Sequence, residues 1–149
     1  TSSADYNLGM GVTALDAITT GDSNIALGHD ALTAMLTGSN NIAIGKGALD
    51  ASDAESNNLA IGLDALGGAI TSDGVKNVAI GNYSLDSNTS GNENIAIGYE
   101  ALQTNQTGEK NTAIGFAAMA YSTGDKNTAI GFAALKVLTT GYNNMLSLQ

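Results

Sequence analysis

The chain has no cysteine, no proline, no tryptophan and no arginine among its 149 residues. Without cysteine it can form neither a disulfide framework nor a thiolate metal site. Without proline every residue keeps its backbone N–H donor, which suits a structure that is hydrogen-bonded along its whole length. Five lysines face 14 acids, which gives a net charge of −9. We therefore expect no nucleic-acid partner, because phosphate binding needs a basic surface.

Long apolar runs are also missing. No stretch approaches the roughly 20 residues of a transmembrane helix, and the first residues show no signal-peptide pattern, so we expect no membrane insertion. The hydrophobic content of 43% is still enough to build a core. The chain begins without methionine and inside a degraded repeat. We expect residues 1–149 to be a single repeat domain and a fragment of a longer fibre.

The chain does contain a short repeat that runs along its whole length. Counting an asparagine as offset zero, the consensus is N-x-A-I-G-x-x-A-L, five variable residues, then G-x-x before the next asparagine. Eight full copies precede a degenerate one, and most are 17 residues apart, with 19 before the fifth asparagine and 16 before the eighth. So short a period indicates a solenoid, in which each coil buries its apolar side against its neighbours. The asparagines are Asn7, Asn24, Asn41, Asn58, Asn77, Asn94, Asn111, Asn127 and the degenerate Asn144.

Within each copy, offsets zero to three predict a short strand that the glycine at offset four ends. Side chains alternate along a strand, so the aliphatic residues at offsets one and three share one side and form a ladder. The alanine and leucine at offsets seven and eight favour a helical turn, and we expect the leucine to fold under that ladder. The predicted fold is all-β with short helical turns, a parallel β-solenoid or β-roll. The two residues inserted near Gly67, Gly68 and Ser72 should bulge from one connecting loop.

The other side of the predicted strand carries alanine in seven copies, from Ala26 to Ala129. A column of alanines implies that another part of the structure approaches too closely for a larger side chain. A second chain on that side would explain the small residues, and so would tight packing within one chain.

The asparagines at offset zero have a mechanical interpretation. In stacked parallel coils identical side chains lie about 4.8 Å apart, so one amide can donate to the next and form a ladder. Asparagine also tolerates the turn conformations that open such a strand. We expect a structural ladder from Asn24, Asn41, Asn58, Asn77, Asn94, Asn111 and Asn127.

Residues with catalytic or metal-binding chemistry are few and scattered. His29 beside Asp30 has no equivalent in another copy, and one histidine without cysteine makes a poor metal site. The acids fall at different offsets, unlike the regular pattern of a calcium-binding roll. Nothing suggests a catalytic triad. We expect no enzyme activity, no metal and no cofactor.

Aromatic residues occur at offsets five and six of four consecutive copies: Tyr83, Tyr99, Phe116 and Phe132. They could form a stacking surface for sugars or a contact patch for a partner. The alternative is that they pack under a loop or against another subunit. They are the candidate binding residues of this chain.

The N-x-A-I-G segments resemble the repeats of trimeric autotransporter adhesin heads. The longer N-T-A-I-G-x-x-A-L form, from Asn111 and Asn127, is similar to the repeat regions of phage and bacterial tail-fibre-like proteins. The resemblance covers the chain from Asn7 to about Asn144. It implies a β-roll in a homotrimer, although adhesin-head repeats are usually shorter than 17 residues.

Repeat and resemblance together predict a structural and adhesive fibre segment of a viral tail fibre or bacterial surface adhesin, attaching to a host or surface. The expected location is extracellular, on a cell surface or a virion. The expected partners are further copies of the chain, as a homotrimer or filament, and a cell-surface glycan or receptor. The alternative is a self-assembling structural filament without a specific ligand, growing by end-to-end stacking.

Overall fold

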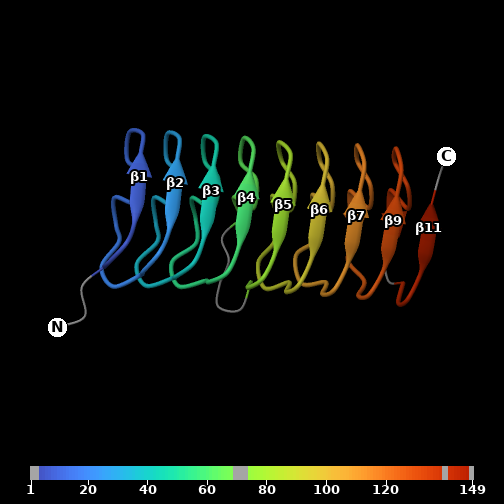
Figure 1. Ribbon diagram of the computed structural model, residues 1–149. Coiled ribbons are helices and arrows are strands. Elements are labelled where there is room, and N and C mark those ends of the chain that lie inside the picture. Colours follow the sequence, from blue (N-terminus) through green and yellow to red (C-terminus); the bar gives the residue numbers. More distant parts are fainter. Residues whose placement is uncertain (1–3, 69–73, 139–140, 148–149) are drawn as a thin grey trace.

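The computed structural model describes residues 4–68, 74–138 and 141–147. These residues form a row of similar coils, with one strand of each coil side by side in a parallel sheet and the first and last strands at opposite ends of the row (Figure 1). The predicted all-β parallel solenoid is confirmed. The sheet contains, in order, β1 (Leu8–Met10), β2 (Ile25–Leu27), β3 (Ile42–Ile44), β4 (Leu59–Ile61), β5 (Val78–Ile80), β6 (Ile95–Ile97), β7 (Thr112–Ile114), β9 (Thr128–Ile130) and β11 (Met145–Ser147).

Equivalent positions of the repeat lie beside each other through the whole sheet. Ala26 pairs with Ala43, and the pairing stays in frame across the longer copy, where Ala60 pairs with Ala79. The two inserted residues therefore leave the register intact. Of the residues expected to bulge, Gly67 and Gly68 are described, whereas Ser72 lies outside the described residues.

The two sides of the strand are reversed relative to our expectation. All seven alanines at offset two, Ala26 to Ala129, are completely buried. They pack in one cluster with the alanines of offset seven and the leucines of offset eight. The aliphatic residues at offsets one and three point outward, and Ile95 is 38% exposed. The prediction that the leucines fold under an aliphatic ladder is wrong, because they pack against the alanines instead.

The thinness of the coil explains why alanine is the inward residue. In the first coil Gly9 replaces the alanine, and a Cβ placed on it would lie 3.3 Å from the Ala14 carbonyl oxygen and 3.5 Å from Leu15 Cδ1. A larger side chain would overlap the opposite wall of its own coil. Tight packing within one chain therefore accounts for the alanine column, because that side of the strand is closed inside its own coil.

The turn after each strand is not helical, contrary to the sequence prediction. The residues at offset six and at offset eight have left-handed backbone angles, as in Leu32 with a φ of 53° and Leu102 with a φ of 51°. This conformation costs about 1–2 kcal/mol for a residue with a Cβ. It places the alanine and the leucine, two successive residues, inside the coil. It also lets the Leu32 N–H donate to the Ala48 carbonyl oxygen of the next coil at 3.1 Å.

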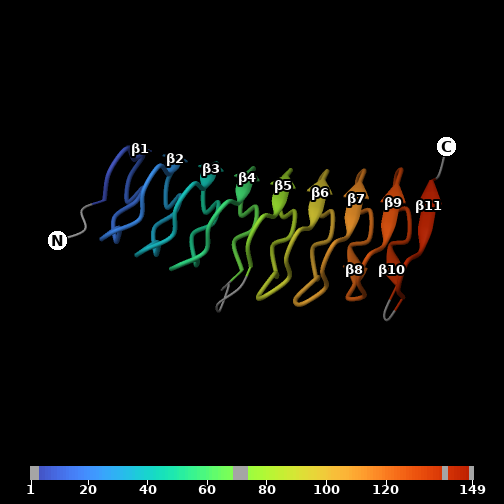
Figure 2. The ribbon, with the colours of Figure 1, turned by 60° about the horizontal axis from the view of Figure 1, so that its bottom comes forward.

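A second, two-stranded sheet lies at the C-terminal end of the row, away from the main sheet (Figure 2). It pairs β8 (Tyr121–Ser122) with β10 (Val137–Leu138) in parallel. The repeat consensus does not predict it, because both strands fall in the variable part of the coil.

Candidate functional site

The asparagines at offset zero join each coil to the next, and those from Asn24 to Asn127 are buried. The Oδ1 atom of Asn94 accepts the backbone N–H of Asn111 at 2.9 Å, and its Nδ2 donates to the Gly108 carbonyl oxygen at 2.8 Å. The same pair of bonds recurs along the row, from Asn7 to Asn127. Each amide thus satisfies two buried backbone groups of the following coil.

This arrangement differs from the amide-to-amide ladder that we expected. Among the described residues, asparagine side chains bond directly to each other at three steps, at 3.0–3.2 Å, as from Asn41 Nδ2 to Asn24 Oδ1. The recurring partners are backbone groups, because the turn before each strand presents a free carbonyl and a free N–H to the amide. The asparagine column is a clamp on the backbone of the next coil.

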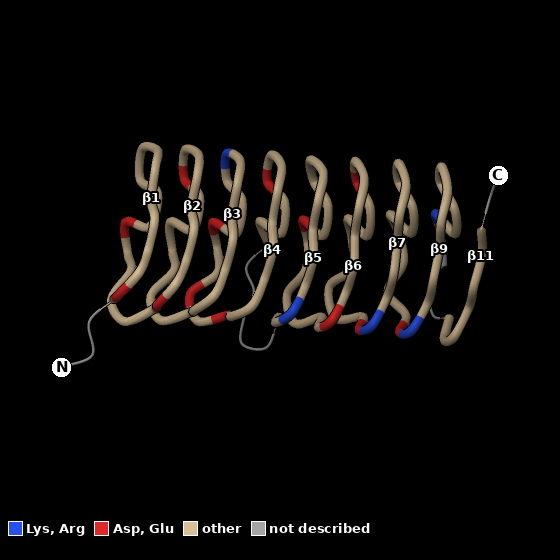
Figure 3. The backbone as a smooth tube through the Cα atoms, viewed as in Figure 1, with Lys and Arg blue, Asp and Glu red and all other residues tan. Residues whose placement is uncertain are grey.

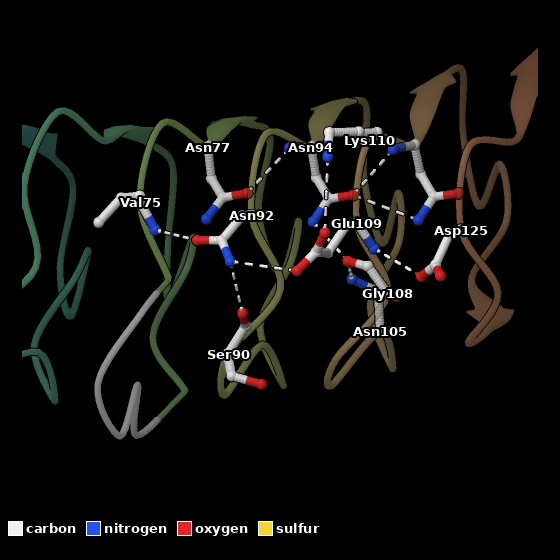
Figure 4. A network of polar contacts seen from close by, with 11 residues as sticks. Val75, Asn77, Ser90, Asn92, Asn94, Asn105, Gly108, Glu109, Lys110 and Asp125 are labelled. Carbon is white, nitrogen blue, oxygen red and sulfur yellow. Dashed lines mark hydrogen bonds and ion pairs between the residues drawn. The ribbon is translucent and has the colours of Figure 1, made fainter.

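A second polar column, at offset minus two, was not anticipated. The backbone N–H of the residue at this offset donates to the side chain of the residue at the same offset in the next coil. The Val75 N–H donates to Asn92 Oδ1 at 2.9 Å, and the Glu109 N–H donates to Asp125 Oδ1 at 3.0 Å. Figure 4 shows these bonds beside the asparagine clamp. Ser39 and Ser56 take the same role earlier in the chain. The signal in the sequence was that most residues at this offset are Asp, Ser, Asn or Glu.

A third polar group lies inside the coil, at offset eleven, and was also missed. Asn88 and Asn105 are fully buried, and their Nδ2 atoms donate to the carbonyl oxygens of Gly91 and Gly108. Within the described residues their Oδ1 atoms lack a hydrogen-bond partner. In an earlier coil Met35 occupies the same place. The interior therefore changes from apolar to polar along the row.

The outward side of the main sheet is an apolar surface that recurs in each full copy of the repeat. We call it the strand face, and define it by the residues at offsets one and three. In the eight full copies its side chains are partly or well exposed, and they are apolar except for two threonines. A flat, continuous apolar surface of this kind is typical of a protein contact site. Its members are Leu8, Met10, Ile25, Leu27, Ile42, Ile44, Leu59, Ile61, Val78, Ile80, Ile95, Ile97, Thr112, Ile114, Thr128 and Ile130.

The four candidate aromatic residues are brought together in one stack just after the strands. Tyr99 and Phe116 are parallel, with ring centroids 5.2 Å apart and 11° between the planes, and Phe116 and Phe132 repeat this geometry at 5.2 Å and 10°. Tyr83 meets Tyr99 edge to face at 5.8 Å. Exposure rises along the stack to 73% at Phe132.

This stacking bears on the suggestion that the rings bind sugars. A sugar ring packs on the face of an aromatic ring, whereas here the faces of Tyr99 and Phe116 are turned toward neighbouring rings and their edges point outward. The stack is therefore better suited to an edge contact with a protein surface.

A hydrogen bond to Glu100 raises the pKa of the Tyr99 hydroxyl above its ordinary value.

Charge is distributed unevenly along the row. Residues 1–75 carry nine acids and one lysine, whereas residues 76–149 carry five acids and four lysines. Lysines of the later coils lie at the bends that lead into the strands (Figure 3).

His29 is exposed and its Nδ1 lies 2.5 Å from Asp30 Oδ2, so the pair is a local surface contact.

Two aspartates in the variable part of the coil give a testable pH dependence. Partial burial, and secondly the charge of Asp64, raise the pKa values of Asp50 and Asp86 above the ordinary 3.8. A carboxyl group whose pKa is raised in the folded state stabilises the fold only when it is protonated. The protein therefore loses stability as the pH rises and this group ionises. We expect Asp86→Asn to raise the melting temperature by a few degrees at pH 7 and to leave it unchanged at pH 3. Thermal unfolding followed by circular dichroism at both pH values measures this, and an equal shift at both would contradict it.

Among the described residues there is no pocket, no group of three or more potential metal ligands and no helix long and apolar enough to cross a membrane. The features that remain for recognition are two surfaces, the strand face and the aromatic stack. Comparison of the chain with family models, with curated proteins and with solved structures found no match.

Proposed function

We propose that this chain is a rigid structural segment of an extracellular fibre, from a viral tail fibre or a bacterial surface adhesin, and that it works as a homotrimer joined through the strand face. The fibre holds attachment sites away from the particle or cell and presents them in several copies. Multiple copies strengthen weak surface contacts by raising their effective concentration.

The observation that carries this proposal is the outward aliphatic strand face. Ile42, Ile95 and Ile130 are each more than a third exposed, although each lies on a strand that has a neighbour on both sides in the sheet. At about 4.8 Å per strand the face is roughly 40 Å long, and with its borders about 20 Å wide, so it offers on the order of 800 Å². That is about the area that each partner contributes to a stable protein interface. A second copy of the chain has the same length and spacing, so its strand face matches this one.

The resemblance of the N-x-A-I-G repeats to adhesin heads and tail-fibre-like proteins supports the number of copies and the extracellular location. The asparagine clamp supports the mechanical role, because each coil holds the next by two side-chain hydrogen bonds in addition to its backbone bonds.

Multi-angle light scattering on the purified protein tests the proposal. We expect a discrete mass of three chains that does not change with moderate dilution. A mass of one chain at every concentration would overturn the homotrimer. Open-ended growth with concentration would instead indicate the self-assembling filament without a specific ligand.

A further inference from the structure

The interior of the rod carries polar side chains at offset eleven of three consecutive coils. We call this row the polar seam, and it consists of Asn88, Asn105 and Ser122, which are all fully buried. Backbone hydrogen bonds on both sides of Asn88 join its segment to the segment of Asn105. Equivalent side chains of neighbouring coils lie about 4.8 Å apart. The seam therefore places three polar groups in line inside a core built largely of alanine and leucine.

The amide oxygens of the two asparagines in the seam are unpaired acceptors. The Nδ2 of Asn88 donates to the Gly91 carbonyl oxygen at 3.1 Å, and the Nδ2 of Asn105 donates to the Gly108 carbonyl oxygen at 2.9 Å. These bonds identify the nitrogen of each amide, because a carbonyl oxygen needs a donor. Within the described residues neither Oδ1 atom has a hydrogen-bond partner. Buried polar atoms are rarely left unpaired in native proteins, so each oxygen calls for a donor.

The coil has room for one more heavy atom beyond each of these oxygens. In the coil of β2 the same offset carries Met35, which is fully buried. A Cβ built on Gly38 would lie 2.3 Å from Met35 Sδ. In the coil of β5 a Cβ built on Gly91 would lie 2.5 Å from Asn88 Oδ1, so the sulfur and the oxygen occupy equivalent positions. Methionine continues beyond this position by a buried methyl group, and a water molecule needs about the same space.

The chemistry of the seam favours water over a metal ion. All three side chains of the seam are neutral, and a hard cation requires about six oxygen ligands or more. A buried water needs only two to four polar partners. Ser122 Oγ donates to the Leu135 carbonyl oxygen at 3.2 Å and keeps lone pairs that accept a further hydrogen bond. Each gap in the seam is therefore bounded by two polar side chains, which is enough for one water.

We propose that the polar seam binds two ordered water molecules, one between Asn88 and Asn105 and one between Asn105 and Ser122. The first donates to Asn88 Oδ1 and bonds to the amide of Asn105, and the second donates to Asn105 Oδ1 and to Ser122 Oγ. A water about 2.8 Å from each of two polar atoms spans the spacing of about 4.8 Å between coils. The waters join the coils of β5, β6 and β7 from inside the rod.

Nuclear Overhauser transfer from water to the side-chain amide protons of isotopically labelled asparagine tests this proposal in the unmodified protein. We expect transfer from a long-lived water to the Nδ2 protons of Asn88 and Asn105. Asn24 and Asn41 are the controls, because they are equally buried and their Oδ1 atoms already accept backbone N–H groups. No transfer to Asn88 and Asn105, or equal transfer to all four residues, would overturn the proposal.

Asn105→Met fills the seam with the side chain that the chain itself uses at this offset in the coil of β2. The Gly108 carbonyl oxygen keeps the Nδ2 of Asn94 as a donor, so the variant should fold. The added methyl group takes the place of the waters, and we expect the transfer from water to the Asn88 amide to disappear. Unchanged transfer to Asn88 would overturn the proposal. A direct hydrogen bond from Asn105 Nδ2 to Asn88 Oδ1 in the unmodified protein would also overturn it.

Met35→Asn is the converse variant and keeps the proposal testable if Asn105→Met does not fold. It places an amide beside Ser52, whose Oγ is buried and has no hydrogen-bond partner among the described residues. This arrangement repeats that of Asn105 beside Ser122. We expect the new amide to receive transfer from a long-lived water. A folded Met35→Asn protein without this transfer would contradict the claim that the coil holds a water at this offset.

Discussion

Replacing Gly98 by alanine is expected to destabilise the rod by about 4 kcal/mol or more, among the largest effects of a single methyl group. Gly98 follows β6 with a φ of 133°, a region that residues with a Cβ rarely adopt. The added Cβ would lie 2.4 Å from the Gly115 carbonyl oxygen and 2.6 Å from the carbonyl carbon. Backbone of the next coil cannot move aside without breaking its own hydrogen bonds. The coils on either side should therefore separate.

Denaturant unfolding followed by circular dichroism measures this effect, and a solenoid split at one coil should unfold in two steps instead of one. The matched control is Gly9→Ala, the same exchange at a position where other coils carry alanine. There the new Cβ meets its nearest atoms at 3.3 Å or more, and the φ of Gly9 is not in the positive range. We expect Gly9→Ala to be neutral or slightly stabilising. A Gly98→Ala variant as stable as this control would contradict the stacked-glycine geometry.

Removal of the Asn94 amide is the second change with a large expected effect. In Asn94→Ala the Asn111 N–H loses its acceptor, and the Gly108 carbonyl loses one of its two donors and keeps Asn105; both groups lie in the buried clamp. An unsatisfied buried polar group costs about 1–3 kcal/mol, so we expect a loss of about 3 kcal/mol in the free energy of unfolding. Hydrogen exchange should also accelerate most at Asn111, because its amide proton becomes unpaired.

Asn92→Ala is the matched control, two residues earlier in the same turn. Asn92 accepts the Val75 N–H at 2.9 Å, but it is only partly buried, so water can replace its bonds. We expect a loss of less than about 1 kcal/mol. An equally small loss in the free energy of unfolding for both variants would contradict the clamp, because the asparagine at offset zero would then contribute no more than its partly exposed neighbour.

The period of the sequence was sufficient to predict the strands of the main sheet, their parallel register and the stacking of equivalent residues. It implied that Asn94 lies next to its equivalents, although the main partners of its amide are backbone groups, and that Tyr99, Phe116 and Phe132 follow the strands at the same offset. These features depend only on which residues recur at the same offset. They would be predicted equally well for any chain with so regular a repeat.

The period could not decide which side of the strand faces inward. In Ile95–Ile97 both sides are apolar, so the alternation of polar and apolar residues that normally marks the core is absent. The width of the coil decided the question, and that width depends on the left-handed turn residues. Leucine does not favour that conformation, so Leu102 gave no sign of it in the sequence.

The central claim is that alanines stabilise each coil from within while the strand face joins separate chains. The double variant Ile44→Asp, Ile97→Asp tests it most directly, by light scattering for mass and circular dichroism for folding in the same sample. Both isoleucines point outward and are partly exposed, so charge on them should block association and spare the coil. We predict a folded single chain. An unfolded chain would mean that these isoleucines are core residues, and a folded trimer would mean that the strand face does not join the chains.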